Sequence, residues 1–152
     1  MVWKSINEKK CTYSILVFLQ FAGIFYIFAT AEMFVQNTIL FITELVGIVL
    51  GVWAVFSMKV GNFNISPRIR EGSVMKTGGP YRVIRHPMYL AIIITLTPLV
   101  YGYYSFWRLV VLLVLIFLLV IKIEIEEKLL SGHFEGYQLY RNKTWKLVPF
   151  VY

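Results

Sequence analysis

The chain is short of the residues that tie many small domains together through covalent bonds or metal ions. It has one cysteine, Cys11, and two histidines, and every one of its 8 acidic residues is glutamate. A single cysteine cannot form an intrachain disulfide, and one cysteine with two histidines gives no zinc-ligand spacing. We therefore expect neither a disulfide framework nor a metal site.

Charge is also missing from long stretches of the chain. No charged residue lies between Lys10 and Glu32, residues 33–58 carry only Glu44, and residues 87–107 carry none. The chain is 59% hydrophobic, above the roughly 45–50% of globular proteins. A helix needs about 20 mostly apolar residues to cross a bilayer. We therefore predict four transmembrane helices, at residues 12–32, 37–58, 87–104 and 106–130.

The apolar segments do not alternate with period two, as the strands of a membrane barrel would. Backbone that crosses lipid must then be helical, because its polar groups find no water there. The predicted fold is an all-α integral membrane protein with a single domain over residues 1–152. In this prediction residues 1–58 form two scaffold spans and residues 59–152 carry the motifs. The fourth span continues from the membrane as an amphipathic C-terminal helix.

Basic residues outnumber acidic ones, and they are distributed unevenly. The net charge is +7, and of the 15 Lys and Arg residues only Arg108, at the start of predicted span four, falls on the other side of the membrane. The positive-inside rule then puts both termini and the loop of residues 59–86 in the cytosol. Anionic lipid headgroups explain this basicity better than nucleic acid does. We therefore expect membrane lipids as partners, and no nucleic acid.

Two features of the scaffold spans have a direct structural interpretation. Gly47 and Gly51 form a small-xxx-small pattern, which predicts close approach of another helix. Glu44 lies about two turns from the outer end of its span, where a hydrogen-bonded or water-exposed structural role is favoured over catalysis. An aromatic stripe in the first span indicates packing or lipid contact. It consists of Phe18, Phe21, Phe25 and Phe28.

The segment GGPYRVIRHPMYL, residues 78–90, mixes turn residues with basic side chains directly before the third span. Gly78 and Gly79 allow positive φ and close approach of a ligand. Pro87 favours a helix start and pushes His86 out of the helical region, and Tyr89 then shares a face with His86. The helix N-terminus, with Arg82 and Arg85 nearby, makes an anion site plausible. A basic loop on lipid headgroups is the alternative.

The tail that follows the fourth span is the second polar region. Lys122 and Glu126 lie one helical turn apart on one face. Carboxylates at Glu126 and Glu127 adjoin the membrane, where they are costly unless paired or wet. Their natural partners are the cations of the 59–86 loop or a cationic ligand, and a solvated helix end is the alternative. His133 follows a Ser-Gly pair that predicts a helix break, and we interpret it as a surface residue.

These two regions resemble a known family. GPYRVIRHPMY is similar to the G-x-Y-x-x-x-R-H-P-x-Y signature of the isoprenylcysteine carboxyl methyltransferases and the related membrane phospholipid methyltransferases. The Glu pair at 126–127, with HFEGYQLY and Pro149 after it, resembles the family's E-E-x-x-L…F…Y-x-x-Y…P tail. The resemblance covers roughly residues 60–152. It implies an integral membrane enzyme that uses S-adenosyl-L-methionine.

The resemblance also implies roles for individual residues. Arg85, Lys122 and Glu126 become the candidate catalytic residues, with Lys122 standing where the prenylcysteine enzymes carry an arginine linked to substrate binding. If the acceptor is an amine, His86 or Glu126 is the candidate base. The implied cofactor contacts are Ser73, Val74, Met75, Lys76, Tyr81, His86, Pro87, Met88, Tyr89 and Glu126.

The sequence thus predicts a methyltransferase that uses S-adenosyl-L-methionine at the cytosolic membrane face. Its acceptor would be membrane-associated or lipophilic, such as a prenylated cysteine, and would enter from the bilayer between spans. A phospholipid N-methyltransferase is one alternative. A non-catalytic lipid-binding protein of the same fold is another.

Overall fold

A computed structural model describes residues 2–32, 34–58 and 77–149, with side chains from Tyr13 onward. These described ranges are helical and contain no strand, only one isolated β-bridge. The elements in chain order are α1 (Val2–Thr30), α2 (Thr38–Met58), the 3-10 helix η1 (Gly79–Arg82), α3 (Pro87–Gly102), α4 (Phe106–His133) and α5 (Tyr137–Arg141). The all-α prediction therefore holds.

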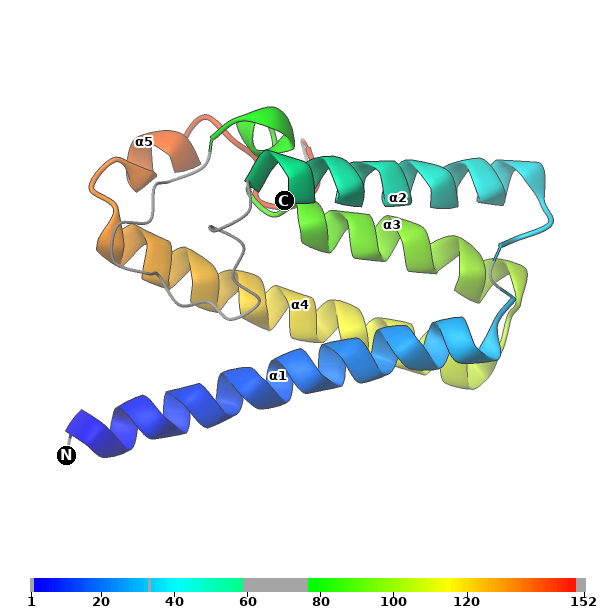
Figure 1. Ribbon diagram of the computed structural model, residues 1–152, viewed down its shortest axis with the longest axis horizontal. Coiled ribbons are helices and arrows are strands. Elements are labelled where there is room, and N and C mark those ends of the chain that lie inside the picture. The colour runs from blue at the N-terminus through cyan, green and yellow to red at the C-terminus, as the bar shows by residue number, and fades with distance from the viewer. Residues whose placement is uncertain (1, 33, 59–76, 150–152) are drawn as a thin grey trace.

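The four long helices run alternately in opposite directions (Figure 1). α2 packs chiefly against α3, and α1 packs chiefly against α4. The α1–α2 and α3–α4 connections lie at one end of the bundle, whereas η1, α5 and the start of α1 lie toward the other (Figure 1). This arrangement agrees with the predicted grouping of both chain ends with the 59–86 loop. The cytosolic location of that end remains a prediction.

Among the described residues, two helices are long and apolar enough, by length and composition, to cross a membrane. The qualifying segments are Tyr13–Thr30 of α1 and Thr38–Met58 of α2, and α3 is a shorter apolar helix. The count of four spans and the amphipathic C-terminal helix stay predictions. One boundary was predicted wrongly, because α4 continues through the Ser131–Gly132 pair and ends at His133. His133 is exposed, as expected of a surface residue.

The glycine pattern in α2 faces α3, as predicted. A Cβ atom added to Gly47 would lie 2.7 Å from the Thr95 backbone nitrogen, and one added to Gly51 would lie 3.3 Å from the Ala91 Cβ. The absence of side chains at these positions lets the two helix backbones approach closely. The α2–α3 pair is consequently the tightest helix contact in the bundle.

A second core joins α1, α3 and α4. Its fully buried side chains include Ile27, Leu96, Leu99, Leu115 and Leu119. By contrast, the aromatic stripe of α1 points outward, with Phe18 and Phe25 71% and 74% exposed. Exposed aromatic side chains on an apolar helix favour lipid contact over packing as the role of the stripe.

Glu44 is buried at the end of the bundle where the α1–α2 connection lies. It is 1% exposed, and its Oε2 accepts a hydrogen bond from the Val35 backbone N–H at 3.3 Å. A buried carboxyl group that accepts a backbone hydrogen bond ties the connection to α2. This contact supports the structural role expected from the sequence.

The Gly47 contact predicts the effect of a single methyl group. Gly47→Ala should destabilise the protein by about 1–3 kcal/mol, because the added Cβ meets the Thr95 backbone, which cannot move alone. Thermal unfolding in detergent measures the change. Gly132→Ala is the matched control: a Cβ there meets nothing within 4 Å, so the stability should stay equal or rise by up to about 1 kcal/mol. Equal melting temperatures for the two variants would contradict the packing assignment.

Candidate functional site at the junction of α3 and α4

The turn before α3 is fixed by a glycine in the left-handed region. Gly79 has φ +60, and a Cβ there would lie 2.9 Å from the Ser57 Cβ of α2. Gly78 has φ −98 and does not use positive φ. The predicted positive φ is therefore confirmed at Gly79 and not at Gly78, and the neighbour that requires a glycine at position 79 is helix α2. Close approach of a ligand stays a prediction.

The start of α3 follows the prediction. The helix begins at Pro87, and His86 is its N-cap residue with φ −123, outside the helical region. The His86 ring stacks on the Tyr89 ring, with centroids 5.8 Å apart and planes 8° apart. Proline at the first helical position thus places these two side chains together on the face directed toward α4.

The C-terminal tail runs alongside the segment before α3. The Trp145 N–H donates to the Val83 carbonyl at 2.9 Å, and the Arg85 N–H donates to the Trp145 carbonyl at 2.8 Å. These bonds form a parallel bridge between Ile84 and Trp145. The Lys146 ammonium adds an ion pair to Glu124 of α4. The tail therefore closes over the end of the bundle.

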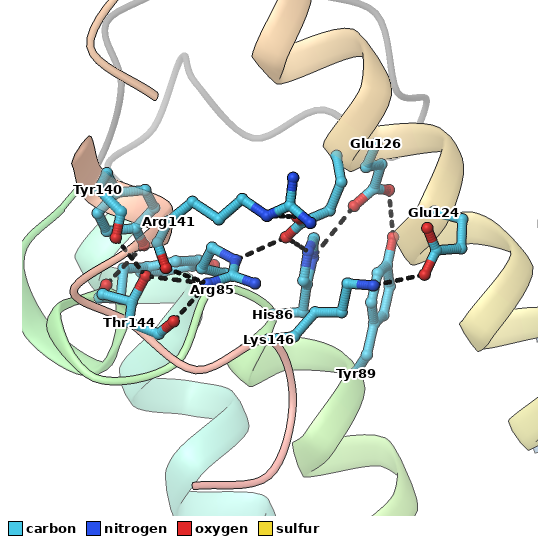
Figure 2. A network of polar contacts seen from close by, with 11 residues as sticks. Arg85, His86, Tyr89, Glu124, Glu126, Tyr140, Arg141, Thr144 and Lys146 are labelled. Carbon is cyan, nitrogen blue, oxygen red and sulfur yellow. Dashed lines mark hydrogen bonds and ion pairs between the residues drawn. The ribbon is translucent and has the colours of Figure 1, made fainter. Parts of the chain in front are cut away.

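Glu127 joins the segment before α3, the tail and the end of α4. Its Oε1 lies 2.6 Å from Arg85 Nε and 3.1 Å from His86 Nε2, and its Oε2 lies 3.7 Å from Arg141 Nε. The Arg85 Nη1 also donates to the Arg141 carbonyl at 3.0 Å and to the Thr144 carbonyl (Figure 2). The buried Glu127 carboxylate thereby holds Arg85 and His86 in place. Through the hydrogen bonds of Arg85, it also holds the tail.

Glu126, the neighbouring residue on α4, has different surroundings. It accepts a hydrogen bond from the Tyr89 hydroxyl, and its Oε2 lies 3.5 Å from His86 Nδ1 (Figure 2). Its side chain is 21% exposed, whereas that of Glu127 is 6% exposed. Glu126 is therefore the carboxylate of the pair that a molecule from outside can reach.

The surroundings set the protonation of the groups outside the apolar helices. Burial of the His86 ring acts to lower its pKa, but hydrogen bonds and charge from Glu126 and Glu127 outweigh burial and raise the pKa. Burial raises the pKa of Tyr140 to about 12, although the Arg85 charge opposes it. The tyrosine consequently stays a hydrogen-bond donor, and its hydroxyl donates to the Tyr81 carbonyl at 2.6 Å.

Lys122 points away from the carboxylates and toward α1. Its Nζ donates to Gln20 Oε1 at 2.6 Å and lies 5.0 Å from the centroid of the Tyr89 ring. Lys122 and Gln20 are 3% and 6% exposed. Tyr89 thus connects them to Glu126, because its hydroxyl donates to the carboxylate while its ring contacts the ammonium.

Most of the predicted site residues meet in this region. His86 and Tyr89 from the start of α3 contact Glu126, while Pro87 is buried and Met88 half-buried in the same helical turn. Tyr81 lies in η1, and its buried hydroxyl has no hydrogen-bond partner among the described residues. The predicted contacts Ser73, Val74, Met75 and Lys76 lie outside the described residues.

Sequence reasoning missed three parts of this site. It paired the Glu126–Glu127 carboxylates with loop cations but gave Glu127 no separate role, although the doubled glutamate was a usable signal. Gln20 lies in an apolar helix that we interpreted as scaffold, and a lone amide there was the only hint. The tail contacts of Arg141 and Thr144 use mainly backbone carbonyls, which leave no trace in the sequence.

In the described residues, a bundle of apolar helices carries a polar cluster at one end, where the starts and ends of helices meet. The chain belongs to the phospholipid methyltransferase family, whose sequence profile matches residues 35–137. It is therefore a membrane methyltransferase of a family that acts on lipids. The match confirms the resemblance found in the sequence. Among curated proteins, none matches the chain.

The Glu127 contacts predict a large loss of stability when its charge is removed. Glu127→Gln leaves the buried Arg85 and His86 cations without their shared carboxylate, and we expect a loss of about 3 kcal/mol. Thermal unfolding in detergent measures it, and limited proteolysis should show earlier cleavage of the tail. Glu135→Gln removes a charge from an exposed position and should change neither result. A Glu127 variant as stable as the control would refute the role of Glu127 in holding Arg85 and His86.

The raised pKa of His86 predicts a dependence of stability on pH. A histidine whose folded-state pKa lies above its unfolded value of about 6.5 stabilises the fold below that value. This contribution is lost as the pH rises through the folded pKa. His86→Gln should flatten the dependence of the melting temperature on pH above about pH 6.5. A wild-type profile that rises over this range would contradict the assignment.

Proposed function

We propose that the protein transfers a methyl group from S-adenosyl-L-methionine to a membrane-associated or lipophilic acceptor at the junction of α3 and α4. One observation carries the proposal. Two motifs that lie 37 residues apart in the chain meet there, with the Tyr89 hydroxyl on the Glu126 carboxylate and the His86 ring beside both. Membership of a methyltransferase family supports the same conclusion.

The residues at the junction fit the chemistry of the cofactor. S-Adenosyl-L-methionine carries an ammonium group, a carboxylate, ribose hydroxyls and a methyl group on a positively charged sulfur. The partly exposed Glu126 suits the ammonium or a ribose hydroxyl, and the exposed Arg82 suits the carboxylate. The Tyr81 hydroxyl is a buried polar atom in need of a partner. Residues 73–76 would wrap the cofactor from the loop side.

When bound, the cofactor supplies an activated methyl group, so the protein mainly has to align the acceptor and exclude water. Tyr89 and His86 hold the Glu126 carboxylate in place. Arg85 is fully engaged by Glu127 and the tail, which favours a positioning role over contact with the acceptor. Lys122 is then the candidate to orient the polar head of the acceptor.

The acceptor determines whether a base is needed. A carboxylate or thiolate needs none, and a prenylated cysteine follows from the resemblance to the isoprenylcysteine enzymes. A phospholipid amine is the second candidate, favoured by the description of the family whose profile matches. It requires removal of a proton. Because Glu126 and Glu127 raise the pKa of His86, its ring is less available to accept a proton, and Glu126 is the better candidate base.

Loss of the Glu126 charge tests the cofactor site. Glu126→Gln should weaken binding of S-adenosyl-L-methionine about tenfold or more, because a hydrogen bond to a charged group is lost. Titration calorimetry on protein in lipid nanodiscs measures the affinity. Glu135→Gln is the control and should bind as the wild type does. The proposal fails if the wild type binds no S-adenosyl-L-methionine, as a non-catalytic lipid-binding protein would.

Transfer of radiolabelled methyl groups separates the two acceptor classes. Nanodiscs that contain phosphatidylethanolamine test amine methylation, and N-acetyl-S-farnesylcysteine tests carboxyl methylation. Base-labile methyl ester indicates the second reaction, whereas base-stable label in lipid indicates the first. Cofactor binding without transfer to either acceptor or to total membrane lipid would argue against a lipid methyltransferase.

A further inference from the structure

The surroundings of Lys122 are unusual for a buried cation. Lys122 is 3% exposed, and its ammonium contacts the neutral amide oxygen of Gln20 and the face of the Tyr89 ring. Among the described residues, no carboxylate forms an ion pair with it. The Glu126 carboxylate on the next helical turn acts on this charge without a direct ion pair. A buried cation held in this way is costly, so its retention in an apolar region points to a function.

Gln20 is equally out of place. It belongs to the face of α1 that packs against α4, where the other buried members are Leu16 and Ile27. Gly23 lies on the same face, and a Cβ there would meet Val111 at 3.6 Å. Gln20 thus interrupts an apolar stripe inside the segment Tyr13–Thr30, which is apolar enough to cross a membrane.

The geometry gives Gln20 one evident task, because its Oε1 lies 2.6 Å from the Lys122 Nζ. The amide accepts one proton of the ammonium without neutralising its charge. An ammonium has three N–H donors, and the Tyr89 ring contributes only a cation–π contact. The ammonium is therefore held in place with hydrogen-bonding capacity and a full positive charge left for a ligand.

We propose that Gln20 is a positioning residue that holds Lys122 as the receptor for an anionic group of the lipid acceptor. The shared chemistry is an oxyanion, either the phosphate of a phospholipid or the carboxylate of a lipidated cysteine. This inference rests on the proposed methyltransferase function. It adds a specificity determinant from α1, which lies outside residues 35–137 that match the family.

The position of Lys122 relates this receptor to the reaction. Lys122 precedes Glu126 by four residues, about 6 Å along the helix axis, and Tyr89 contacts both side chains. An acceptor whose anionic group reaches Lys122 would thus have its nearby nucleophile beside the proposed cofactor site. A lipid with the same nucleophile but no anionic group would lack this anchor and should be a poor substrate.

Substitutions at Gln20 separate charge from packing. Gln20→Glu keeps the acceptor oxygen but pairs the ammonium with a negative charge, so the KM for an anionic acceptor should rise about tenfold or more. Gln20→Met keeps the size of the side chain but removes the acceptor oxygen, and should raise this KM less. In both variants kcat and the affinity for S-adenosyl-L-methionine should stay near the wild-type values. Gln36→Glu, the same change at an exposed position, is the control.

The acceptor probes identify the source of the oxyanion. Phosphatidylethanolamine is compared with a glycerolipid that carries the same amine on a neutral linker, and N-acetyl-S-farnesylcysteine forms the second arm. Only the arm with the natural source should show the tenfold change. Lys122→Met should abolish the preference of the wild type for the anionic probe, and Lys122→Arg should restore part of it.

Binding measurements keep the inference falsifiable without turnover. Titration calorimetry in detergent gives the Kd of a short-chain phosphatidylethanolamine, of N-acetyl-S-farnesylcysteine and of the neutral analogue. A wild type without preference for either anionic probe, or an unchanged preference in Gln20→Glu and Lys122→Met, would overturn the role of Gln20. Such a result with intact S-adenosyl-L-methionine binding refutes only this inference, whereas loss of cofactor binding by the wild type refutes the proposed function itself.

Discussion

The arrangement of the whole site depends on one buried carboxylate, that of Glu127. It receives Arg85 and His86 from the segment before α3 and faces Arg141 from α5. These elements also share a small apolar core of Ile84, Leu90, Ile123 and Leu147, beside which the charged groups must find partners. Because a buried charge is tolerated only when it is paired, Glu127 and its cations can be satisfied only when all three elements are in place.

Because Glu127 takes up the cations, the neighbouring Glu126 carboxylate is available to bind a ligand. Successive residues on a helix point about 100° apart. Glu127 therefore faces Arg85, whereas Glu126 is directed toward Tyr89 and the outside. The exposed fractions of 6% and 21% record the difference. Because Glu127 pairs with Arg85, the partners of Glu126 are the Tyr89 hydroxyl and the His86 ring, which also contacts Glu127. A carboxylate in such surroundings can still bind a cation or a hydroxyl group, which is the proposed role.

Particular residues show how far sequence reasoning reaches. Pro87 fixed the start of α3, and the three-residue spacing put His86 and Tyr89 on one face. Gly47 and Gly51 marked the α2–α3 contact correctly. The same reasoning failed at Ser131–Gly132, because the preceding helix continues through a pair with weak helix propensity. At Gly79 it predicted the positive φ correctly but did not name the neighbour, which is Ser57 of α2. A glycine shows that something comes close, but the sequence does not say what.

The sequence by itself determined the helices, the two motifs and the family, because periodicity, proline chemistry and long apolar stretches are local properties. Only the tertiary structure decided which polar groups meet. Glu127 rather than Glu126 receives Arg85, the tail pairs with residues 83–86, and Gln20 from α1 reaches Lys122 across 102 residues of chain. The physical reason is that hydrogen bonds and ion pairs depend on distances of a few ångströms between side chains, and helix packing sets those distances.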